Sequence, residues 1–397
     1  MTSPTDPRQV HRADVLMDGK LAARLTREGS TIEFRYDEDH LSSGGSAVAT
    51  TLPLSDEPVR TTGGAVPPYF AGLLPEGRRL SALKNAVKTS ADDEFSLLLA
   101  VGVDPAGAVS VVPEGQRPSR PQARVTVSPT EQLDLGDVLT DSGVTDPVAI
   151  AGVQDKASAR TIALPVHSQG ADAILKISPP EFPALVENES ACFGIGRRNR
   201  LRIPYAGTEL ITDIHGRTGL LVRRFDRQDD RRLAMEDAAQ LLGIWPAQKY
   251  AVTMEEVSAA VTAVCASPVL ALRNLAFQLA MAWLSGNGDL HAKNISVLHD
   301  GRGFSVSPVY DIPSTVPYGD STLALAVGGS TGGLSRRRFL SFTDVTGLPR
   351  AAAEQVADEA LRLTGDAAEE IITATGFDAR RARDLRRVLA HRRRHWG

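Results

Sequence analysis

Between residues 268 and 285 the chain is apolar almost without interruption, which predicts a helix buried on every side. A helix that lacks a polar face packs inside a protein and not on its surface. Gly286 ends the predicted helix, because glycine readily adopts the left-handed conformation in which helices commonly terminate. The apolar members of this helix include Leu272, Leu275, Leu279, Met281 and Leu284.

A β-hairpin is predicted shortly after this helix. The runs Asn294–His299 and Phe304–Val309 have the composition of strands. Between them, residues 300–303 (Asp-Gly-Arg-Gly) form a turn rich in residues that tolerate positive φ. We expect His299 to lie opposite Phe304 in this hairpin.

This pairing gathers polar side chains at one end of the hairpin. It places Asn294 opposite Val309, and Asp311 then leaves the second strand beside the loop that contains Asp289 and His291. Aspartate and asparagine oxygens suit Mg²⁺, which usually takes one or two protein oxygens in addition to nucleotide phosphates. Kinases place a catalytic Asp five residues before a metal-binding Asn, as Asp289 stands before Asn294.

The alternative is a polar loop whose Asp and Asn side chains only satisfy turn amides. Taken together, the polar residues of this region favour a nucleotide site over that alternative. They are Asp289, His291, Lys293, Asn294, Tyr310 and Asp311.

Alternating polar and apolar residues predict β structure at the start of the chain. Residues 14–17 and 20–25 form strands around the turn Asp18-Gly19, and residues 31–36 alternate as a half-buried strand does. A helical portion begins at Pro67, and this first domain closes near residue 115. Residues 116–146 are dominated by Pro, Ser, Gly and charged residues, which indicates a connector. A second domain is predicted from residue 147.

The second domain contains a lysine within an apolar strand. Residues 171–177 carry a lone lysine, Lys176, in an otherwise largely apolar run, and Glu189 follows in a predicted helix that ends near Asn199. An unpaired ammonium is costly to bury, so Lys176 needs phosphate oxygens or Glu189 as a partner. Alternatively, Lys176 extends from an edge strand to the solvent.

Two further segments have weaker signals. In the loop at residues 151–156, Gly152 permits a close approach of backbone amides to phosphate, but a single glycine is weak evidence. Residues 220–227 form an apolar strand that ends in charged residues. That end is either a hinge where backbone groups meet an adenine edge, or a strand end with solvated arginines. After it, residues 235–242 are predicted to form a helix that begins at Met235.

The chain is predicted to end in three helices, at residues 349–363, 366–375 and 378 to the terminus. The last helix has an apolar face and carries eight arginines between Arg380 and Arg394. A charge-rich outer face is typical of a packed surface helix, and contact with nucleic acid or an acidic partner is the alternative.

Composition limits the classes of protein that remain. A length of 397 residues predicts two or three domains. The net charge of −4 argues against binding to nucleic acid through overall charge. The two cysteines, Cys192 and Cys265, make a disulfide framework unlikely and fit a reducing compartment. The first ten residues have no apolar core of a signal peptide, and no apolar run reaches about 18 residues. We therefore expect a cytoplasmic protein with no membrane segment.

Taken in order along the chain, these residues resemble the HipA-type serine/threonine kinase toxins of bacterial toxin–antitoxin pairs. The resemblance covers nearly the whole chain. In the first domain it rests on Pro75-Glu76-Gly77, on Gly102-x-Asp104 and on Gly107-Ala108-Val109. In the second it rests on Ala151-Gly152-Val153-Gln154-Asp155-Lys156, Lys176, Asn188-Glu189, Arg224-Phe225-Asp226-Arg227, Lys249-Tyr250, Asn287-x-Asp289-x-His291-x-Lys293-Asn294 and Tyr310-Asp311.

The resemblance implies an α+β fold, in which a small N-terminal β-rich domain precedes a two-lobed kinase-like unit with a mostly helical C-terminal lobe. Residues 1–115 correspond to the N-terminal domain, 116–146 to the connector, 147–228 to the N-lobe and 229–397 to the C-lobe. The implied activity is that of a serine/threonine protein kinase that uses ATP and Mg²⁺. The implied partners are a helix-turn-helix, HipB-like antitoxin, DNA bound mainly through that antitoxin, and a protein substrate such as an aminoacyl-tRNA synthetase.

The same resemblance implies roles for single residues. Asp289 would be the general base that deprotonates a substrate hydroxyl. Asn294 and Asp311 would hold Mg²⁺, and Lys176 would neutralise phosphates with Glu189 as its orienting partner. The rest of the implied nucleotide-binding set is Ala151, Gly152, Val153, Gln154, Asp155, Lys156, Arg223, Arg224, Phe225, His291, Lys293 and Tyr310.

One position departs from the family. Family members often have a serine before the loop that corresponds to residues 151–156, and its autophosphorylation switches the kinase off. Here Ala149 stands at that position and has no hydroxyl group, and the nearest downstream hydroxyls belong to Ser158 and Thr161. We therefore expect that control rests on an antitoxin or another partner and not on this loop.

Two other classes of function remain open at this point. One is a kinase-fold phosphotransferase that acts on a small molecule or lipid, which only substrate screening separates from a protein kinase. The other is a non-catalytic, antitoxin-bound co-repressor. The presence of Asp289, Asn294, Asp311 and Lys176 argues against an inactive kinase.

Overall fold

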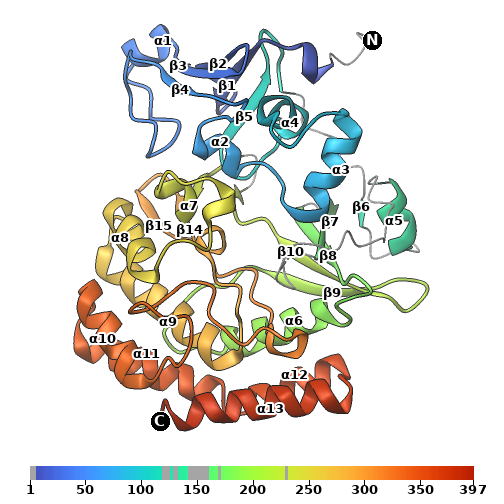
Figure 1. The fold of residues 1–397 in the computed structure, drawn as a ribbon, viewed down its shortest axis with the longest axis vertical. Helices are drawn as coiled ribbons and strands as arrows, with labels where there is room; N and C mark the ends of the chain where they lie inside the picture. The colour runs from blue at the N-terminus through green and yellow to red at the C-terminus, as the bar shows by residue number, and fades with distance from the viewer. Residues whose placement is uncertain (1–5, 119–125, 128–132, 142–160, 169–170, 229–230) are drawn as a thin grey trace.

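The computed structural model describes residues 6–118, 126–127, 133–141, 161–168, 171–228 and 231–397. Figure 1 shows the N-terminal sheet domain at one end of the molecule, a second sheet and a group of helices in the middle, and the C-terminal helices at the other end. In this described part, every helix is too short or too polar to cross a lipid bilayer.

The N-terminal domain is built on a five-stranded sheet with the order β4-β3-β2-β1-β5. The turn between the first two strands has positive φ at both Asp18 and Gly19, which confirms the predicted hairpin. Phe34, Phe70 and Phe95 fill the core between this sheet and its helices. The strands are β1 (Arg12–Met17), β2 (Lys20–Glu28), β3 (Thr31–Tyr36), β4 (Val59–Thr61) and β5 (Val109–Pro113), and the helices are η1 (Pro7–Gln9), α1 (Glu38–Ser42), α2 (Pro68–Gly72), α3 (Gly77–Val87) and α4 (Glu94–Val101).

The second sheet has the order β6-β7-β8-β10-β9 and lies between two helices (Figure 1). One face packs on α5 through Leu135 and Val138, and the other packs on α6 through Val186 and Phe193. Two of these elements, β6 and α5, come from the predicted connector. The bounds are β6 (Thr126–Val127), α5 (Leu135–Asp141), β7 (Ile162–Ser168), β8 (Ala171–Ile177), α6 (Leu185–Arg197), β9 (Thr208–Thr212) and β10 (Thr218–Arg223).

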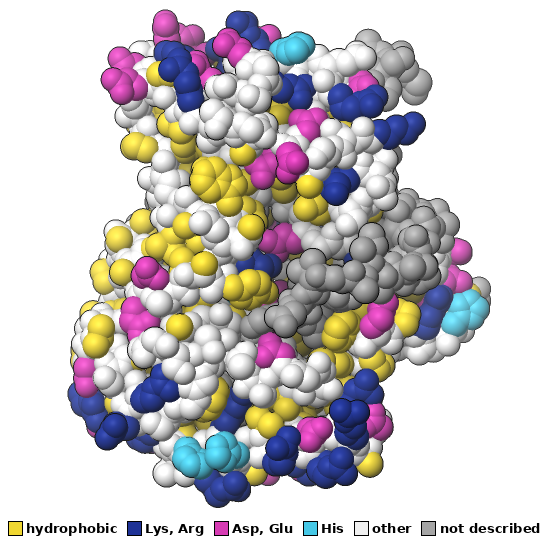
Figure 2. All heavy atoms as spheres, in the orientation of Figure 1, with side chains coloured by type: hydrophobic (Ala, Val, Ile, Leu, Met, Phe, Trp, Pro, Cys, Tyr) yellow, Lys and Arg dark blue, Asp and Glu magenta, His cyan; other side chains and the backbone are white. Residues whose placement is uncertain are grey.

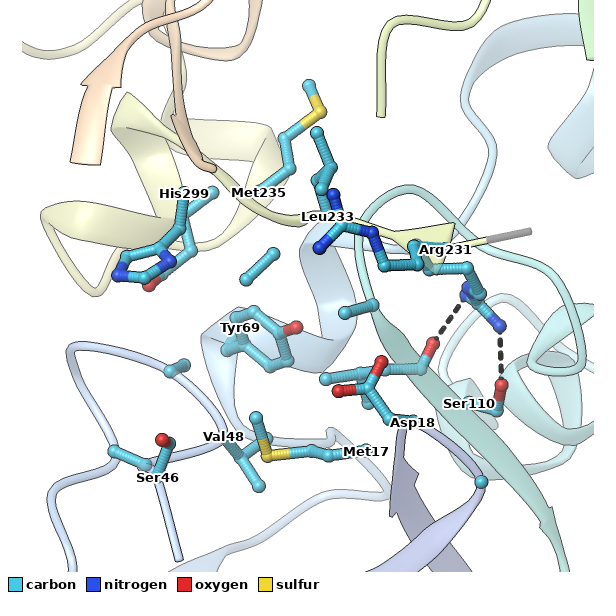
Figure 3. A pocket seen from close by; sticks show the side chains of 18 of the residues that line it. Met17, Asp18, Ser46, Val48, Tyr69, Ser110, Arg231, Leu233, Met235 and His299 are labelled. Atoms are coloured by element: carbon cyan, nitrogen blue, oxygen red, sulfur yellow. Dashed lines mark hydrogen bonds between the residues drawn. The ribbon is translucent and has the colours of Figure 1, made fainter. Parts of the chain in front are cut away.

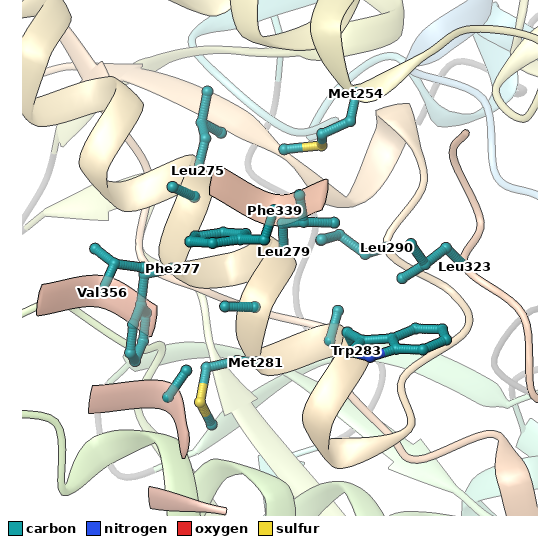
Figure 4. Packing of buried hydrophobic residues seen from close by; sticks show 14 of the residues in the cluster. Met254, Leu275, Phe277, Leu279, Met281, Trp283, Leu290, Leu323, Phe339 and Val356 are labelled. Carbon is teal, nitrogen blue, oxygen red and sulfur yellow. The ribbon is translucent and has the colours of Figure 1, made fainter. Parts of the chain in front are cut away.

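The helical part of the chain is organised around α9 (Pro268–Ser285), whose bounds are those predicted from the apolar run. Figure 4 shows Leu275, Phe277, Leu279 and Met281 of this helix packed against Phe339 and Val356 of later helices. The other helices are α7 (Ala238–Leu241), η3 (Pro246–Gln248), α8 (Met254–Val264), η4 (Ala292–Asn294), η5 (Val316–Tyr318), α10 (Arg336–Thr346), α11 (Arg350–Leu363), α12 (Ala367–Thr375) and α13 (Ala379–Arg394).

The loop after α9 leads into a three-stranded sheet. Its strands are β13 (Ala234–Asp237), β14 (Ser296–His299) and β15 (Phe304–Val306), and a two-stranded hairpin, β11 (Arg227–Gln228) with β12 (Arg231–Arg232), precedes them. The prediction that Met235 begins a helix is wrong: residues 234–237 pair with β14, and the helix begins at Ala238.

The predicted hairpin is correct near its turn and wrong at its other end. His299 lies opposite Phe304, as expected. Asn294, however, lies in η4 and does not pair with Val309. The backbone of Val309 instead bonds to the segment 204–206: its N–H donates to the Pro204 carbonyl, and its carbonyl accepts from Ala206. Pairing with this segment ends the hairpin early.

The N-terminal domain docks on the rest of the molecule through buried polar contacts. Arg224 and Arg227 both pair with Asp104, at 3.0 and 2.6 Å. Asp226 accepts a hydrogen bond from the backbone N–H of Gly107 (2.9 Å). A cavity of about 830 Å³ lies beside this junction, and Figure 3 shows Tyr69 of the N-terminal domain and Met235 and His299 of the helical part around it.

Glu236 at this junction has an unusual ionisation. It accepts hydrogen bonds from the Thr50 backbone (3.0 Å) and hydroxyl (2.9 Å), but burial raises its pKa from 4.5 to about 7. The folded protein therefore binds a proton that the unfolded chain releases, and the contribution of Glu236 to stability falls as the pH rises from 4.5 to 7.

Glu236→Gln keeps an acceptor for Thr50 and removes the ionisable group. We expect the free energy of unfolding of the variant, relative to wild type, to rise between pH 5 and pH 8 by up to about 3 kcal/mol. Urea unfolding of both proteins at a series of pH values measures this difference. The same pH dependence in both proteins would contradict the assignment.

The last helix, α13, has the two faces that its sequence predicts. Ala382, Leu385 and Leu389 are buried, and five of its arginines are exposed. Figure 2 shows Lys and Arg side chains along the lower edge of the molecule, where Figure 1 places the C-terminal helices. Arg392 differs from the others because it is buried, where it lies over the ring of Trp283 and donates to the Trp283 carbonyl. That contact fixes α13 on the end of α9.

Candidate active site

The loop after α9 is held in place by glycines and by a threonine. Gly286 has a φ of 83°, and a Cβ there would lie 2.7 Å from the hydroxyl of Ser314. A Cβ on Gly288 would lie 2.6 Å from the Thr315 hydroxyl, which in the structure accepts a hydrogen bond from the Gly288 N–H. Only glycine fits at these two positions, because the segment from residue 314 to 322 passes so close to the loop.

Asp289 is buried at the centre of this loop. Its carboxylate accepts a hydrogen bond from the Tyr250 hydroxyl at 3.0 Å. The side-chain amide of Asn294 donates to the Asp289 carbonyl oxygen (2.9 Å) and lies 3.4 Å from its carboxylate. The Asp289 N–H donates to Asn287 (2.8 Å). These contacts orient the Asp289 carboxylate and join it to Asn294.

Lys176 lies between two carboxylates that come from distant parts of the chain. Its ammonium is 2.8 Å from Glu189 on α6 and 2.7 Å from Asp311. Although burial disfavours the charged form, both carboxylates raise the pKa of Lys176. Burial also opposes the ionisation of Asp311, yet the Lys176 ammonium lowers the pKa of that carboxyl group. Lys176 is therefore charged and paired, and it does not extend to the solvent.

Helix α6 positions both Lys176 and the segment that contains Asp311. Asn188 exchanges two hydrogen bonds with Ser314, donating to its carbonyl (2.8 Å) and accepting from its N–H (3.0 Å). Its neighbour Glu189 holds the ammonium of Lys176. Asp311 has a φ of 56°, a left-handed conformation that is uncommon for residues other than glycine. Lys176 holds the Asp311 carboxylate, and Asn188 holds Ser314 three residues later, so the segment is fixed in this conformation.

The donor set at this site fits a magnesium ion bound together with a nucleotide. Asn294 uses its amide nitrogen on Asp289, so its oxygen would be available to the ion, and Asp311 would contribute a carboxylate. A hard cation that usually keeps several waters and phosphates needs no more protein ligands than these two. Within the described ranges there is no group of three or more His, Cys, Asp and Glu side chains that could hold a metal by themselves.

His291 is buried next to Asp289 and stays neutral. Burial, followed by the charge of Lys249, lowers the pKa of His291 to about 3. Its Nδ1 can therefore accept the hydrogen bond from the Lys293 N–H (3.2 Å). The ring of Tyr250 meets the ring of His291 edge-on, with centroids 5.0 Å apart. His291 thus supports Tyr250 and the loop around Asp289.

The structure brings some of the predicted nucleotide-binding residues together. Phe225 and Tyr310 are in contact, with ring centroids 5.5 Å apart, and both pack on the cluster formed by α6 and β10. The Tyr310 hydroxyl donates to the Lys293 carbonyl (2.8 Å). Arg223 ends β10 and is exposed. Residues 149–156, which include Ala149 and the predicted phosphate loop, lie outside the described residues, so that prediction stays open.

The side chains of two other predicted residues point to the N-terminal domain. Arg224 pairs with Asp104 and Asp226 and is therefore not solvated. These contacts do not include Lys176. Lys293 donates to the carbonyl oxygen of Gly72 at the end of α2 (2.8 Å). Both side chains are therefore engaged in the domain junction.

Sequence patterns alone did not identify the residues that orient Asp289 and the segment after Asp311. Tyr250 lies 39 residues before Asp289, in a segment predicted only as a loop. Asn188 gives no local signal of its contact with Ser314, 126 residues away. Their place in the family motifs was the signal that could have drawn attention to both residues.

Known protein families match both parts of the chain. The family model of the HipA N-terminal domain matches residues 13–112, and that of the HipA-like C-terminal domain matches residues 148–368. The protein Y4mE of Sinorhizobium fredii is 30% identical over 339 residues, which are 79% of this chain and 80% of that protein. The serine/threonine-protein kinase toxin HipA of Shewanella oneidensis is 26% identical over 382 residues, 88% of this chain and 85% of that protein.

Solved structures show the same fold. A complex of HipA, HipB and operator DNA from the Shewanella oneidensis toxin–antitoxin system contains a chain that matches with a TM-score of 0.75 and 21% identity. The match covers 96% of this chain and 97% of that one. The predicted α+β fold is therefore confirmed, and relatives named as kinases support a kinase at the level of the family. Both halves of the chain match their family models, and the chain belongs to the HipA family.

Proposed function

We propose that this chain is an ATP- and Mg²⁺-dependent serine/threonine protein kinase that acts as the toxin of a bacterial toxin–antitoxin pair. One observation carries the proposal: the fold brings together Lys176, Glu189, Asp311 and the Asp289–Asn294 pair, which come from four separate segments of the chain. Lys176 contacts Glu189 and Asp311, and Asp289 contacts Asn294.

Each of these residues has a defined task in phosphoryl transfer. Asp289 accepts the proton of the substrate hydroxyl and orients that hydroxyl toward the phosphate. Lys176 neutralises phosphate oxygens while Glu189 holds it in place. Asn294 and Asp311 would hold Mg²⁺, which neutralises charge that develops on the phosphates. Phosphoryl transfer requires mainly positioning and charge neutralisation, and this set of residues supplies both.

The partners follow from the same proposal. We expect a HipB-like helix-turn-helix antitoxin and contact with DNA mainly through it, because the structural relative is a complex of HipA, HipB and operator DNA. We expect the substrate to be a protein of the translation machinery, such as an aminoacyl-tRNA synthetase. We assign the target only to this class, because the surfaces that select a target lie outside the motifs.

Phosphosite mapping tests this proposal. Purified protein is incubated with ATP, Mg²⁺ and a bacterial lysate, and new phosphates are located by mass spectrometry. We expect phosphoserine or phosphothreonine on a small number of proteins, dependent on Mg²⁺. Label that appears only on small molecules or lipids would replace the protein substrate by another class. The absence of any transfer would favour a non-catalytic co-repressor.

A further inference from the structure

Two lysines beside the catalytic loop bind to one segment of the N-terminal domain. Lys293 donates to the carbonyl of Gly72, and Lys249 forms an ion pair with Glu76 at 2.7 Å. Both side chains are largely buried, with 12% and 10% of their surface exposed. Residues 72–76, which connect α2 to α3, therefore contact two side chains that lie beside the candidate active site.

Lys249 is also in direct contact with the residue that bonds to the base. Its ammonium lies 5.2 Å from the centre of the Tyr250 ring, within the range of a cation–π contact. The Tyr250 hydroxyl donates to Asp289 at 3.0 Å. A continuous series of contacts thus leads from Glu76 through Lys249 and Tyr250 to Asp289.

The charges around Glu76 favour its ionised form. Burial opposes its ionisation, but the charges of Lys293 and Lys249 hold the pKa of Glu76 below its usual value. In turn, the negative charge of Asp289 adds to burial in raising the pKa of Tyr250, so Tyr250 remains a hydrogen-bond donor. At neutral pH Glu76 is therefore charged and Tyr250 is neutral.

We propose that the N-terminal domain completes the active site, and that Glu76 is a positioning residue that acts through Lys249 and Tyr250 on Asp289. The proposal deepens the kinase assignment and rests on it. Glu76 holds the ammonium of Lys249 against the ring of Tyr250. Without Glu76, that ammonium is free to move toward Asp289 or Asp311, and Tyr250 loses the contact that fixes its ring.

The chain provides a matched control for this ion pair. Arg78, in the helix that follows Glu76, pairs with Glu181 at 2.9 Å across the same two parts of the molecule. This second pair has a similar exposure but makes none of the contacts described for Asp289. A role in docking alone predicts that Glu76→Gln and Glu181→Gln behave alike.

Steady-state kinetics separate the two roles. Glu76→Gln is expected to lower kcat by about 10- to 100-fold with little change in KM for ATP, because a misplaced base slows the chemical step and not nucleotide binding. Glu181→Gln should keep the kcat of wild type, and both variants should unfold at similar temperatures. Equal kcat values for the two variants would overturn the proposal.

A double variant tests whether Lys249 carries the effect. When Lys249→Met is added to Glu76→Gln, no ammonium is left to move toward the base, and kcat should return to the level of Lys249→Met alone. Additive losses would show that the two residues act independently, against the proposal.

A structural measurement keeps the inference separate from the kinase assignment. Crystal structures of the two glutamine variants should show the Tyr250–Asp289 hydrogen bond broken in Glu76→Gln and kept in Glu181→Gln, with or without activity. An intact bond in Glu76→Gln would refute the positioning role. A wild-type protein without phosphoryl transfer, but with a broken bond in Glu76→Gln, would refute the kinase assignment alone.

Discussion

Asp289→Asn is expected to lower kcat by roughly 10²–10⁴-fold, the usual contribution of a positioned general base. Asparagine has nearly the same shape and keeps an oxygen for the Tyr250 hydroxyl, so the loop should retain its conformation. It cannot accept the proton of a substrate hydroxyl. ATP binding, measured by calorimetry, should remain close to that of wild type, because the contacts of Lys176 and Asp311 are unchanged.

The same variant connects the chemistry to the effect on cells. Expression of wild type in a host without the antitoxin should slow growth, and Asp289→Asn should be harmless at equal protein levels. Asp300→Asn, on the exposed turn between β14 and β15, is the matched control and should remain toxic. Equal toxicity of wild type and Asp289→Asn would indicate a mechanism that does not depend on phosphoryl transfer.

Local sequence signals were sufficient where an element depends mainly on its own residues. Helix α9 was predicted to the residue because its apolar run has no polar face and ends at Gly286, whose φ is 83°. The turn at Asp18-Gly19 and the strand at residues 31–36 were equally clear. The partner of Lys176 was also among the alternatives considered, since a buried ammonium requires an anion and Glu189 was near in the sequence.

Elements that depend on docking were not predictable in this way. Residues 234–237 have no strand pattern and become β13 only by pairing with β14, 60 residues later. Helix α10 (residues 336–346) is a different case: it was not predicted even though it has local signals, since Ser335 caps its start and Gly347 its end. Nothing in the sequence around Arg224 shows that its side chain pairs with Asp104, because that contact exists only after the two domains meet.

The candidate site shows the same division. The spacing of Asp289 and Asn294 indicated a base and a metal ligand, and the structure joins them by a hydrogen bond. The contacts that orient them come from far away in the sequence: Tyr250 for the base, and Asn188 for the segment after Asp311. Patterns of local spacing identify which residues have the right chemistry, whereas their orientation depends on contacts between distant segments.

Asp311→Ala is expected to weaken Mg²⁺-dependent binding of ATP by at least about 10- to 100-fold. That is the usual loss when a residue that only supports a metal ligand is mutated, and Asp311 is proposed to bind the ion directly. Asp311 supplies the one carboxylate of the proposed metal pair, and Asn294 alone offers a single neutral oxygen. Lys176 still has Glu189 as a partner at 2.8 Å, so the variant should fold. Calorimetry with Mg²⁺ and with EDTA measures the change.

Backbone strain is the competing cause, and a second variant separates it from the loss of charge. Asp311 has a φ of 56°, a conformation that Asn adopts more readily than Ala does. Asp311→Asn should therefore unfold at nearly the temperature of wild type and still lose most of the Mg²⁺ dependence, because an amide is a weaker ligand than a carboxylate. If Asp311→Asn binds ATP as wild type does, with the same gain from Mg²⁺, then Asp311 is not the metal ligand, and its pairing with Lys176 is structural.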